Sequence, residues 1–341
     1  MAYDNRVAVL YGVKDLRVES RPTPEPGPGE LLVEVRSVGV CGSDVHYYEH
    51  GRIGHYVVEQ PLVLGHEASG VVVAAGPGAD ASRVGERVAL EPGVPCGRCA
   101  QCRTGHYNLC PDVRFFATPP IDGAFARYVT INQEFAHRVP DSLDDDEAAL
   151  IEPLSVGVWA SWRAGLRGGE RVLVTGAGPI GLVAAQVARA FGAAEVIVTD
   201  VNPRRLALAA ELGATSVIDL TRESVPADVG ATVLLECSGV PRALVDGIVA
   251  LAPAGTAVAV GMGPSADAVV PLQLIQNREI NLTGTFRYAN TYPSAIAMAA
   301  TGRVQLRPLV TGRFDLDHAE DALTAGSSDP SAIKTVVRPQ E

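Results

Sequence analysis

The feature that most constrains the fold is a glycine-rich turn, Gly176-Ala-Gly-Pro-Ile-Gly181. Apolar residues typical of a strand precede it over 171–175, and apolar residues at helical spacing follow it over 179–191. In such a turn the first glycine reverses the chain, the second lets a diphosphate approach the backbone, and the third lets helix and strand pack closely. The diphosphate would rest on the helix N-terminus, where free N–H groups favour anions. A lone G-x-G-x-x-G is a weak signal, but this strand–turn–helix context predicts a Rossmann dinucleotide-binding domain.

Asp200 supports the same interpretation and bears on which dinucleotide binds. It ends the next expected strand, 195–200, at about the 20-residue offset of the acid that binds the ribose hydroxyls. Its charge would repel a 2′-phosphate, so the sequence favours NAD over NADP. Arg204 and Arg205 leave NADP open, because an arginine there can pair with that phosphate. The structural alternative for Asp200 is a helix cap ahead of Pro203.

The chain after residue 170 alternates short apolar strands, glycine turns and helical segments. This alternation predicts a doubly wound parallel sheet with helices on both faces. The expected strands span 171–175, 195–200, 231–236, 256–261 and 280–284, and the expected helices span 179–191, 203–212 and 241–251.

The first part of the chain has a different pattern. Apolar and polar residues alternate at Leu31, Val33 and Val35, and further strands are expected at 68–75 and 87–90. The proline- and glycine-rich run at 21–29 cannot form a helix or a central strand. This strand-rich section predicts a barrel-like fold. Helix N-terminal signals follow over 141–147, and apolar helical spacing continues through Trp162.

Four cysteines, Cys96, Cys99, Cys102 and Cys110, follow the spacing C-x2-C-x2-C-x7-C. Four thiolates in one short loop can close a tetrahedral zinc site, and a site with four protein ligands is structural because no position stays open. The alternatives are two disulfides or four unrelated buried thiols. Zinc is favoured because disulfides are rare in proteins without a secretory signal.

A second metal site is indicated by Cys41, His66 and Glu67, which lie in glycine-punctuated segments typical of tight turns at strand ends. A thiolate, an imidazole and a carboxylate can supply three protein ligands, and catalytic zinc keeps its fourth position open for water or substrate. Taken singly, each residue has a common structural role as a buried thiol, a hydrogen-bonded histidine or a solvated acid. The hypothesis therefore depends on all three together.

Composition narrows the possible partners and compartment. The chain has 341 residues, of which 47% are hydrophobic and 20% charged, so a packed protein of two domains is expected. The net charge of −11 argues against nucleic acid or an anionic membrane, because both require a basic face. The first residues lack the apolar core of a secretory signal, and no apolar run is long enough for a transmembrane helix. We therefore expect a cytoplasmic protein.

Together these motifs resemble the zinc-containing medium-chain dehydrogenases, and within them the polyol group that includes sorbitol (L-iditol) and xylitol dehydrogenases. The resemblance covers nearly the whole chain. The matching segments are 39–47, 64–67, 87–93, 117–120, 150–157, 176–181 and 286–290. The segments Ile151-Glu-Pro-Leu-Ser155 and Phe286-Arg-Tyr288 are the ones more particular to polyol members.

The resemblance implies that Cys41, His66 and Glu67 bind a catalytic zinc and that the cysteine quartet binds a structural one. It implies that Glu152 contacts the zinc-bound water or substrate; ordinary alcohol dehydrogenases have a cysteine there, and a carboxylate makes the site more polar. The alternative for Glu152 is a helix-terminal acid before Pro153. Some animal members of the group lack the quartet, which this chain keeps.

The resemblance also implies a proton relay through Ser43 and His46, although His46 could be a surface histidine. Tyr47, Arg287 and Tyr288 correspond to substrate-contacting residues, with interdomain packing or a surface ion pair as the alternative. The family positions that touch the dinucleotide are Gly176, Gly178, Pro179, Ile180, Gly181, Asp200, Arg205, Val260, Gly261 and Met262.

The implied architecture is a GroES-like barrel catalytic domain, 1–154 and 286–341, with a Rossmann domain inserted at 155–285. The implied reaction is the reversible oxidation of a secondary alcohol of a polyol to a ketose, with hydride transfer to NAD. Another secondary alcohol, such as butanediol or threonine, is the alternative substrate, and a zinc- and nucleotide-binding protein without turnover is the alternative class. Analogy with the family suggests a homo-oligomer, commonly a tetramer.

Overall fold

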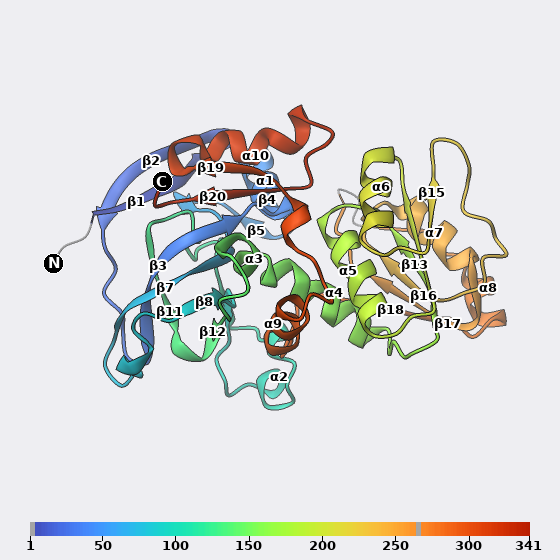
Figure 1. The fold of residues 1–341 in the computed structure, drawn as a ribbon, viewed down its shortest axis with the longest axis horizontal. Helices are drawn as coiled ribbons and strands as arrows, with labels where there is room; N and C mark the ends of the chain where they lie inside the picture. Colours follow the sequence, from blue (N-terminus) through green and yellow to red (C-terminus); the bar gives the residue numbers. More distant parts are fainter. Residues whose placement is uncertain (1–3, 264–266) are drawn as a thin grey trace. The chain divides into compact units, whose positions relative to one another are not determined.

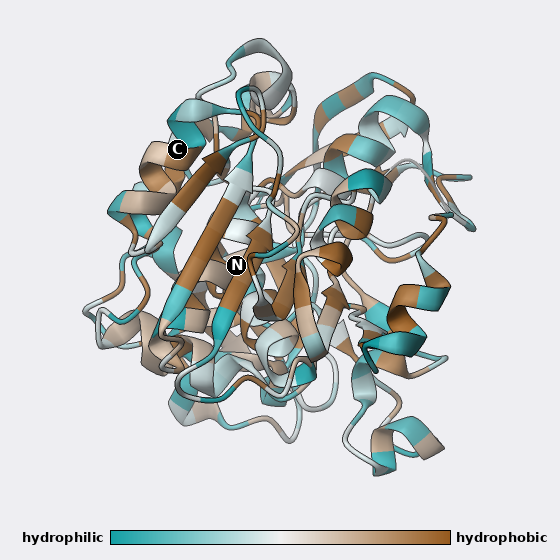
Figure 2. Cartoon of the chain, turned by 90° about the vertical axis from the view of Figure 1, so that its right-hand side faces the viewer, coloured by the Kyte–Doolittle hydropathy of each residue, from teal (hydrophilic) through white to brown (hydrophobic). Residues whose placement is uncertain are grey.

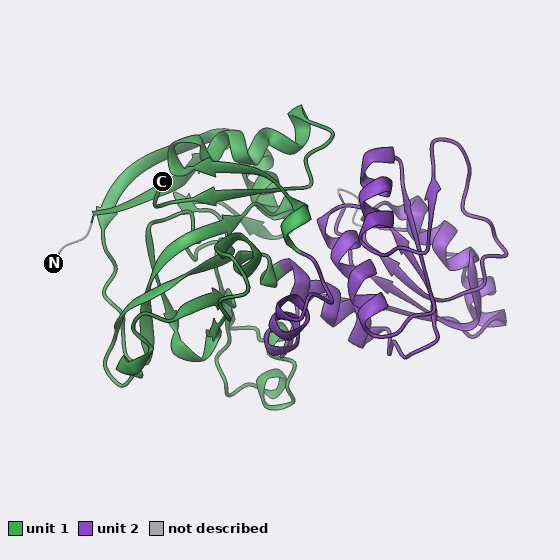
Figure 3. Cartoon of the chain, viewed as in Figure 1, with its two compact units in different colours: residues 1–152, 306–341 green, residues 153–305 purple. Residues whose placement is uncertain are grey.

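The computed structural model describes residues 4–263 and 267–341, and the chain divides into two compact units (Figure 3). The first unit consists of Met1–Glu152 and Leu306–Glu341, and the second consists of Pro153–Gln305. Residues 286–305, which we expected with the catalytic domain, are grouped with the second unit. None of the helices in the described ranges combines the length and hydrophobicity needed to cross a bilayer.

The second unit is built on a six-stranded parallel sheet with the order β15-β14-β13-β16-β17-β18. Numbered from its own first strand, this is the order 3-2-1-4-5-6 of a dinucleotide-binding Rossmann sheet, which reverses direction between β13 and β16. Helices α5, α6 and α7 pack against the strands (Figure 1). The strands are β13 (Arg171–Thr175), β14 (Glu195–Asp200), β15 (Ser216–Asp219), β16 (Ala231–Glu236), β17 (Leu251–Ala259) and β18 (Asn281–Gly284). The helices are α4 (Ile151–Arg163), which begins in the first unit, α5 (Pro179–Ala190), α6 (Pro203–Glu211), α7 (Pro241–Val249), α8 (Leu272–Asn277) and α9 (Tyr292–Ala300).

The expected strands of this sheet agree closely with the observed ones, and β13, β14 and β16 have the predicted bounds. The sequence did not predict β15 or α8. Both are short, and neither has a fully buried residue that would produce an apolar pattern. Their formation depends on the neighbouring elements, since β15 pairs with the parallel strand β14.

The first unit contains a seven-stranded sheet in which β12, β8, β7, β3, β20 and β19 follow one another and β11 also pairs with β3. A separate sheet has the order β2-β1-β6. The strands are β1 (Asp4–Gly12), β2 (Asp15–Pro22), β3 (Glu30–Gly39), β4 (Arg52–Ile53), β5 (Tyr56–Val57), β6 (Leu62–Val63), β7 (Glu67–Ala75), β8 (Arg87–Leu90), β9 (Gly93–Val94), β10 (Arg114–Phe115), β11 (Tyr128–Asn132), β12 (Ala136–Arg138), β19 (Val310–Asp315) and β20 (Lys334–Arg338). The helices are α1 (Gly42–His50), α2 (Ala100–Arg103), α3 (Asp145–Ala149) and α10 (Ala319–Ser328), with short 3-10 turns at 81–83, 107–109, 133–135, 307–309 and 316–318.

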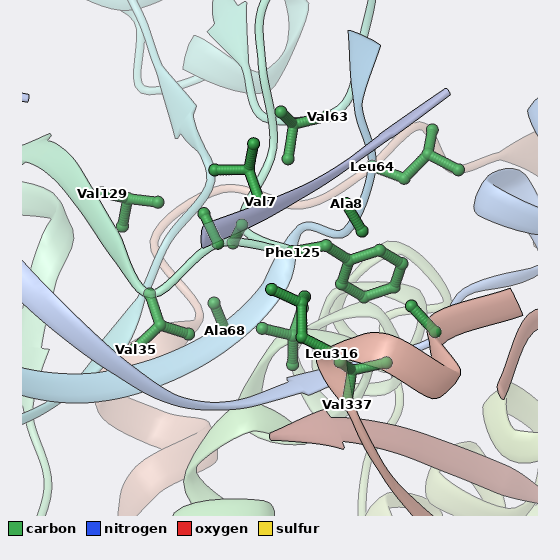
Figure 4. Packing of buried hydrophobic residues seen from close by; sticks show 14 of the residues in the cluster. Val7, Ala8, Val35, Val63, Leu64, Ala68, Phe125, Val129, Leu316 and Val337 are labelled. Carbon is green, nitrogen blue, oxygen red and sulfur yellow. The ribbon is translucent and has the colours of Figure 1, made fainter. Parts of the chain in front are cut away.

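The core of the first unit joins residues from both ends of the chain. Phe125 is completely buried and lies among Val7, Leu64, Leu316 and Val337 (Figure 4). In Figure 2 hydrophobic residues, in brown, occur along the strands and alternate with hydrophilic ones, in teal, on the helices. The carboxyl-terminal strands therefore complete a core that the first 152 residues share.

A buried carboxylate also joins the two segments of the first unit. Asp146 on α3 accepts hydrogen bonds from Ser37 Oγ at 2.8 Å, Arg313 Nε at 2.7 Å and Arg338 Nη2 at 3.0 Å. Burial raises the pKa of Asp146, but the hydrogen bonds from Arg338 and Ser37 outweigh burial, and the net pKa is lowered. The folded protein therefore favours the charged carboxylate.

Replacing Asp146 with asparagine is expected to lower the free energy of unfolding by roughly 2 kcal/mol at pH 7. This is less than for a fully buried pair, because Arg313 and Arg338 stay partly solvated. A lowered folded-state pKa adds stability above the unfolded pKa of about 3.9 and loses it as the pH falls through the folded pKa. The gap between wild type and variant in urea unfolding should thus shrink below about pH 4. Asp145→Asn is the control, because that side chain is 41% exposed. Equal losses in the two variants would contradict the assignment.

Candidate active site and metal centres

Cys41, His66 and Glu67 lie together in the first unit, although 25 residues separate the first two in sequence. One ligand atom from each residue lies within 4.8 Å of the others. Cys41 is the residue before α1, His66 precedes β7, and Glu67 begins β7. His66 and Glu67 are buried and Cys41 is partly buried. A sulfur, a nitrogen and an oxygen in this arrangement fit a zinc ion with an open position.

The convergence depends on the pairing of β3 with β7, which places Gly39 opposite Glu67. A Cβ at Gly39 would collide with the Glu67 side chain. The glycine before the Cys41 turn therefore makes room for the Glu67 carboxylate, which gives the Gly39-Val-Cys motif a steric reason.

Asp44 is a further site residue that the sequence reasoning missed. It is completely buried, and its carboxylate accepts hydrogen bonds from Cys41 N and from Gly65 N, both at 2.9 Å. One oxygen also lies 3.7 Å from Nδ1 of His66. Asp44 thus joins the loops that carry Cys41 and His66 and places a carboxylate beside the imidazole. An acid three residues after the residue that precedes a helix is the available sequence signal.

Lys334 is the second residue that was missed. Its Nζ atom lies 2.7 and 2.8 Å from the two carboxylate oxygens of Glu67 and 2.8 Å from the carbonyl oxygen of Val40. Burial lowers the pKa of Lys334, but the charges of Glu67 and Cys41 outweigh burial and raise it, so the ammonium group stays charged. No motif indicated this contact, because 267 residues separate Lys334 from Glu67.

The protonation of His66 follows from the same cluster. Burial lowers the pKa of His66, but the charges of Cys41 and Asp44 outweigh burial and raise this pKa well above its usual value. Because a metal-bound histidine is neutral, a metal ion at this site would compete with a proton for His66.

Three residues of α1 were singled out from the sequence. Ser43 and His46 are partly buried, and Tyr47 is buried. Nδ1 of His46 is shielded from solvent and has no hydrogen-bond partner among the described residues. Buried ring nitrogens are normally paired, so this atom fits a residue whose partner is a bound ligand group.

Glu152 lies in the first turn of α4 and is buried. Its charge is one of those that raise the pKa of Lys334. Glu152 is therefore near enough to the Cys41, His66 and Glu67 cluster to interact with it electrostatically. Glu152 is thus a helix-terminal acid before Pro153, as its alternative role requires, and it is also buried and close to this cluster.

The cysteine quartet forms a separate cluster. The four sulfur atoms of Cys96, Cys99, Cys102 and Cys110 lie within 4.8 Å of one another, and all four cysteines are free. The backbone N–H groups of Arg98 and Cys99 lower the pKa of Cys96 to about 7. Four sulfur atoms gathered this closely fit a closed tetrahedral zinc site. In this structure none of the four forms a disulfide.

The glycine turn of the second unit lies where the sequence predicted it, between β13 and α5, with Pro179 and Ile180 in the first turn of α5. A Cβ at Gly181 would collide with the carbonyl oxygen of Gly176, whereas a Cβ at Gly178 would meet no atom within 4 Å. The third glycine is thus required by packing, and the second leaves the turn open for a bound group.

Asp200 ends β14 beside this turn. Its carboxylate accepts hydrogen bonds from Ala177 N at 2.6 Å and from Asn202 N at 2.8 Å. The helix cap that we considered as its alternative role is performed by Asn202, which accepts hydrogen bonds from the first residues of α6. Asp200 is therefore held at the carboxyl end of β14, next to β13 and the glycine turn that follows it.

The remaining expected contacts all lie in the second unit. Arg205 is on α6, Gly261 follows β17, and Met262 is highly exposed. Arg287 has a positive φ of 54°, and Tyr288 is buried. Val260 donates its N–H to the Glu236 carbonyl oxygen at 2.8 Å.

Comparisons with known proteins agree with both units. Residues 27–141 match the family model described as the alcohol dehydrogenase GroES-like domain, and residues 179–301 match the model described as zinc-binding dehydrogenase. The sorbitol dehydrogenase of Bacillus subtilis is 44% identical over 325 residues, which are 93% of this chain and 92% of that protein. The sorbitol dehydrogenase of Gallus gallus is 47% identical over 328 residues, again 93% and 92% of the two chains.

The chain belongs to the zinc-containing medium-chain dehydrogenases. Within this family it belongs to the polyol group. A solved structure, L-idonate 5-dehydrogenase from Escherichia coli, superposes with a TM-score of 0.93 at 31% identity and covers 99% of each chain. The expected family, fold class and cofactors, zinc and NAD, are confirmed: this medium-chain dehydrogenase is an oxidoreductase with a GroES-like unit and a Rossmann unit.

Proposed function

We propose that this dehydrogenase reversibly oxidises a secondary alcohol of a polyol, of the sorbitol or xylitol type, to a ketose and transfers the hydride to NAD. The observation that carries the proposal is the 44% and 47% identity to sorbitol dehydrogenases over 93% of the chain. A buried carboxylate, Glu152, near the metal ligands supports it, because a polar site suits a polyhydroxy substrate better than a thiolate does.

The metal ligands in this proposal are Cys41, His66 and Glu67 for the catalytic zinc and the cysteine quartet for the structural zinc. A zinc ion held by the first set would polarise the reacting oxygen and so ease the loss of its proton, while NAD accepts the hydride. Asp44 would keep the Cys41 and His66 loops in register through its two backbone hydrogen bonds. Glu152 would contact the water or the substrate at the open position.

The proton leaves through residues of α1. Ser43 would take the alcohol proton into a hydrogen-bonded chain, and His46 would pass it to solvent by way of the cofactor ribose. The shielded Nδ1 of His46 supports this role, because a bound group would give that atom the partner it otherwise lacks among the described residues. Tyr47, Arg287 and Tyr288 would bind the remaining hydroxyl groups of the polyol, with Arg287 as the hydrogen-bond donor.

The second unit would bind NAD. The diphosphate would lie against Gly176, Gly178, Pro179, Ile180 and Gly181 at the N-terminus of α5, where backbone N–H groups favour anions. Asp200 would bind the ribose hydroxyls and disfavour a 2′-phosphate. Arg205, Val260, Gly261 and Met262 would line the rest of the dinucleotide site.

We further propose that the enzyme is cytoplasmic, forms a homo-oligomer, a tetramer by analogy with its relatives, and has neither nucleic acid nor membrane as a partner. The net charge of −11 supports the last point. Sedimentation analysis of the purified protein measures the oligomeric state directly.

A substrate panel tests the proposed reaction. The zinc-loaded protein is assayed with sorbitol, xylitol, ribitol, mannitol, butanediol and threonine, and NADH is followed by absorbance. We expect kcat/KM for sorbitol or xylitol to exceed that for butanediol by about tenfold or more, because each hydrogen bond to a buried polar group that a smaller substrate leaves unmade costs roughly 1–3 kcal/mol.

Two results would contradict the proposal. A preference for butanediol or threonine would move the enzyme to another group of secondary-alcohol dehydrogenases. No turnover with any compound, from protein shown to contain zinc and to bind NAD, would favour a zinc- and nucleotide-binding relative without activity.

A further inference from the structure

Lys334 makes an unusually complete set of contacts at the proposed catalytic metal site. An ammonium group has three donors. In this structure they face Glu67 Oε1 at 2.7 Å, Glu67 Oε2 at 2.8 Å and the Val40 carbonyl oxygen at 2.8 Å. The lysine side chain is 4% exposed and the Glu67 side chain 1% exposed, so solvent does not screen this pair.

The backbone holds Lys334 in this position. Lys334 is the first residue of β20. This strand pairs with β3 so that Val336 lies opposite Gly39. Gly39 in turn lies opposite Glu67 across the β3–β7 pairing. The ammonium group therefore touches both ligand-bearing segments, Glu67 itself and the residue that precedes Cys41. Lysine side chains usually reach solvent, but the position of Lys334 in the sheet directs its side chain into the protein interior.

The positive charge of Lys334 should weaken the binding of a metal ion by Glu67. Both oxygens of Glu67 accept hydrogen bonds from the same cation, so electron density that could be donated to zinc is shared with the ammonium group. A positive charge in hydrogen-bond contact with a ligand also repels a second cation at that ligand, and burial makes the repulsion stronger than in water.

We propose that Lys334 is a positioning residue of the catalytic site: it shares the Glu67 carboxylate with the zinc ion and so limits how strongly Glu67 coordinates the metal. The proposal rests on the assignment of Cys41, His66 and Glu67 as zinc ligands made above. A weaker carboxylate ligand leaves the metal more electron-poor and keeps its fourth position available for the substrate oxygen. Lysine occurs only at positions 14 and 334, so the other cations of the chain are arginines or histidines.

The test measures zinc release to a chromogenic chelator from the full-length, zinc-loaded protein. Lys334→Gln removes the charge and keeps a donor, Lys334→Met removes both, and Lys334→Arg keeps the charge. We expect both uncharged variants to release the catalytic zinc at least about tenfold more slowly than wild type, because the repulsion is gone. Lys334→Arg should remain close to wild type.

Two controls isolate the effect. Arg338→Met removes another cation from β20, one that pairs with the buried Asp146 rather than with Glu67, and should leave catalytic zinc release unchanged. Cys41→Ala shows which kinetic phase belongs to the cysteine quartet, and that phase should be the same in every Lys334 variant.

A spectroscopic readout separates a change in coordination from a general loosening of the fold. With Co²⁺ at the catalytic site, the visible absorption bands should shift in Lys334→Gln and Lys334→Met and return towards wild type in Lys334→Arg. A purely structural lysine would leave the bands unmoved.

The proposal is overturned if the uncharged variants release zinc as fast as wild type or faster, or if the Co²⁺ bands do not change. Failure of both uncharged variants to fold in excess zinc would overturn it too, because stronger zinc binding should compensate for the lost ion pair. Neither readout needs a substrate. A negative result in the polyol panel would therefore not affect the conclusion about Lys334. Unchanged zinc release would likewise not affect the conclusion about the substrate.

Discussion

Replacing Cys41 with alanine is expected to abolish polyol oxidation while the cysteine quartet keeps its zinc. The thiolate is one of the three proposed protein ligands in the first cluster, and its loss would leave His66 and Glu67 to hold the ion. A metal that polarises the reacting oxygen supplies several kcal/mol of transition-state stabilisation, so kcat/KM should fall by roughly a thousandfold or more. Metal analysis should show a decrease from about two zinc ions per chain to about one.

Cys237→Ala is the matched control for this experiment. Cys237 is a free cysteine like Cys41, but burial raises its pKa far above the usual value, and it belongs to neither cysteine-containing metal cluster of the described residues. The variant should keep both zinc ions. Retention of both zinc ions in Cys41→Ala would refute the assignment of Cys41 as a ligand, whatever happened to the activity.

The second large effect is expected from Gly181→Ala. The added methyl group would overlap the carbonyl oxygen of Gly176, so the turn or the helix has to move. Overpacking of this kind costs about 1–3 kcal/mol, and for a unit of this size each kcal/mol lowers the Tm by roughly 2–4 °C. NAD affinity should fall as well, because the displaced turn carries the backbone N–H groups proposed to bind the diphosphate.

Gly178→Ala distinguishes cofactor binding from folding. A Cβ at this position meets no protein atom within 4 Å, so the Tm without NAD should match wild type. The same methyl group would occupy the surface that the diphosphate approaches, so NAD affinity should still fall. Calorimetry without NAD and titration with NAD measure the two quantities separately. A Gly178→Ala protein that bound NAD normally would place the diphosphate elsewhere.

Much of the Rossmann unit was predictable because its information is local. The strands at 171–175, 195–200 and 231–236 are continuous apolar runs, since a parallel sheet is buried on both faces. The glycine turn and Asp200 follow from the same strand–turn–helix logic. The edge strand β15 escaped prediction because its residues are only partly buried or exposed and carry no apolar pattern.

The first unit was harder to predict because its sheet contains strands that are far apart in the sequence. The pattern of residues 21–90 indicated strands and a barrel, but the pairing of β20 with β3 joins residues nearly 300 positions apart in sequence. Such pairings have no local signature. The division of the chain at Leu306 depends on the same long-range contacts.

The sequence by itself indicated the donor chemistry of this dehydrogenase: seven candidate metal ligands, a candidate phosphate-binding turn and a candidate acid for the ribose, recognised from residue type, local motifs and resemblance to the family. Only the tertiary structure decided which charges surround those donors. Asp44 holds two ligand loops through backbone N–H groups, and Lys334 reaches Glu67 from the far end of the chain. Ligand identity is a property of a few neighbouring residues, whereas the electrostatic environment of a buried site is the sum over every charge that folding brings within a few ångströms.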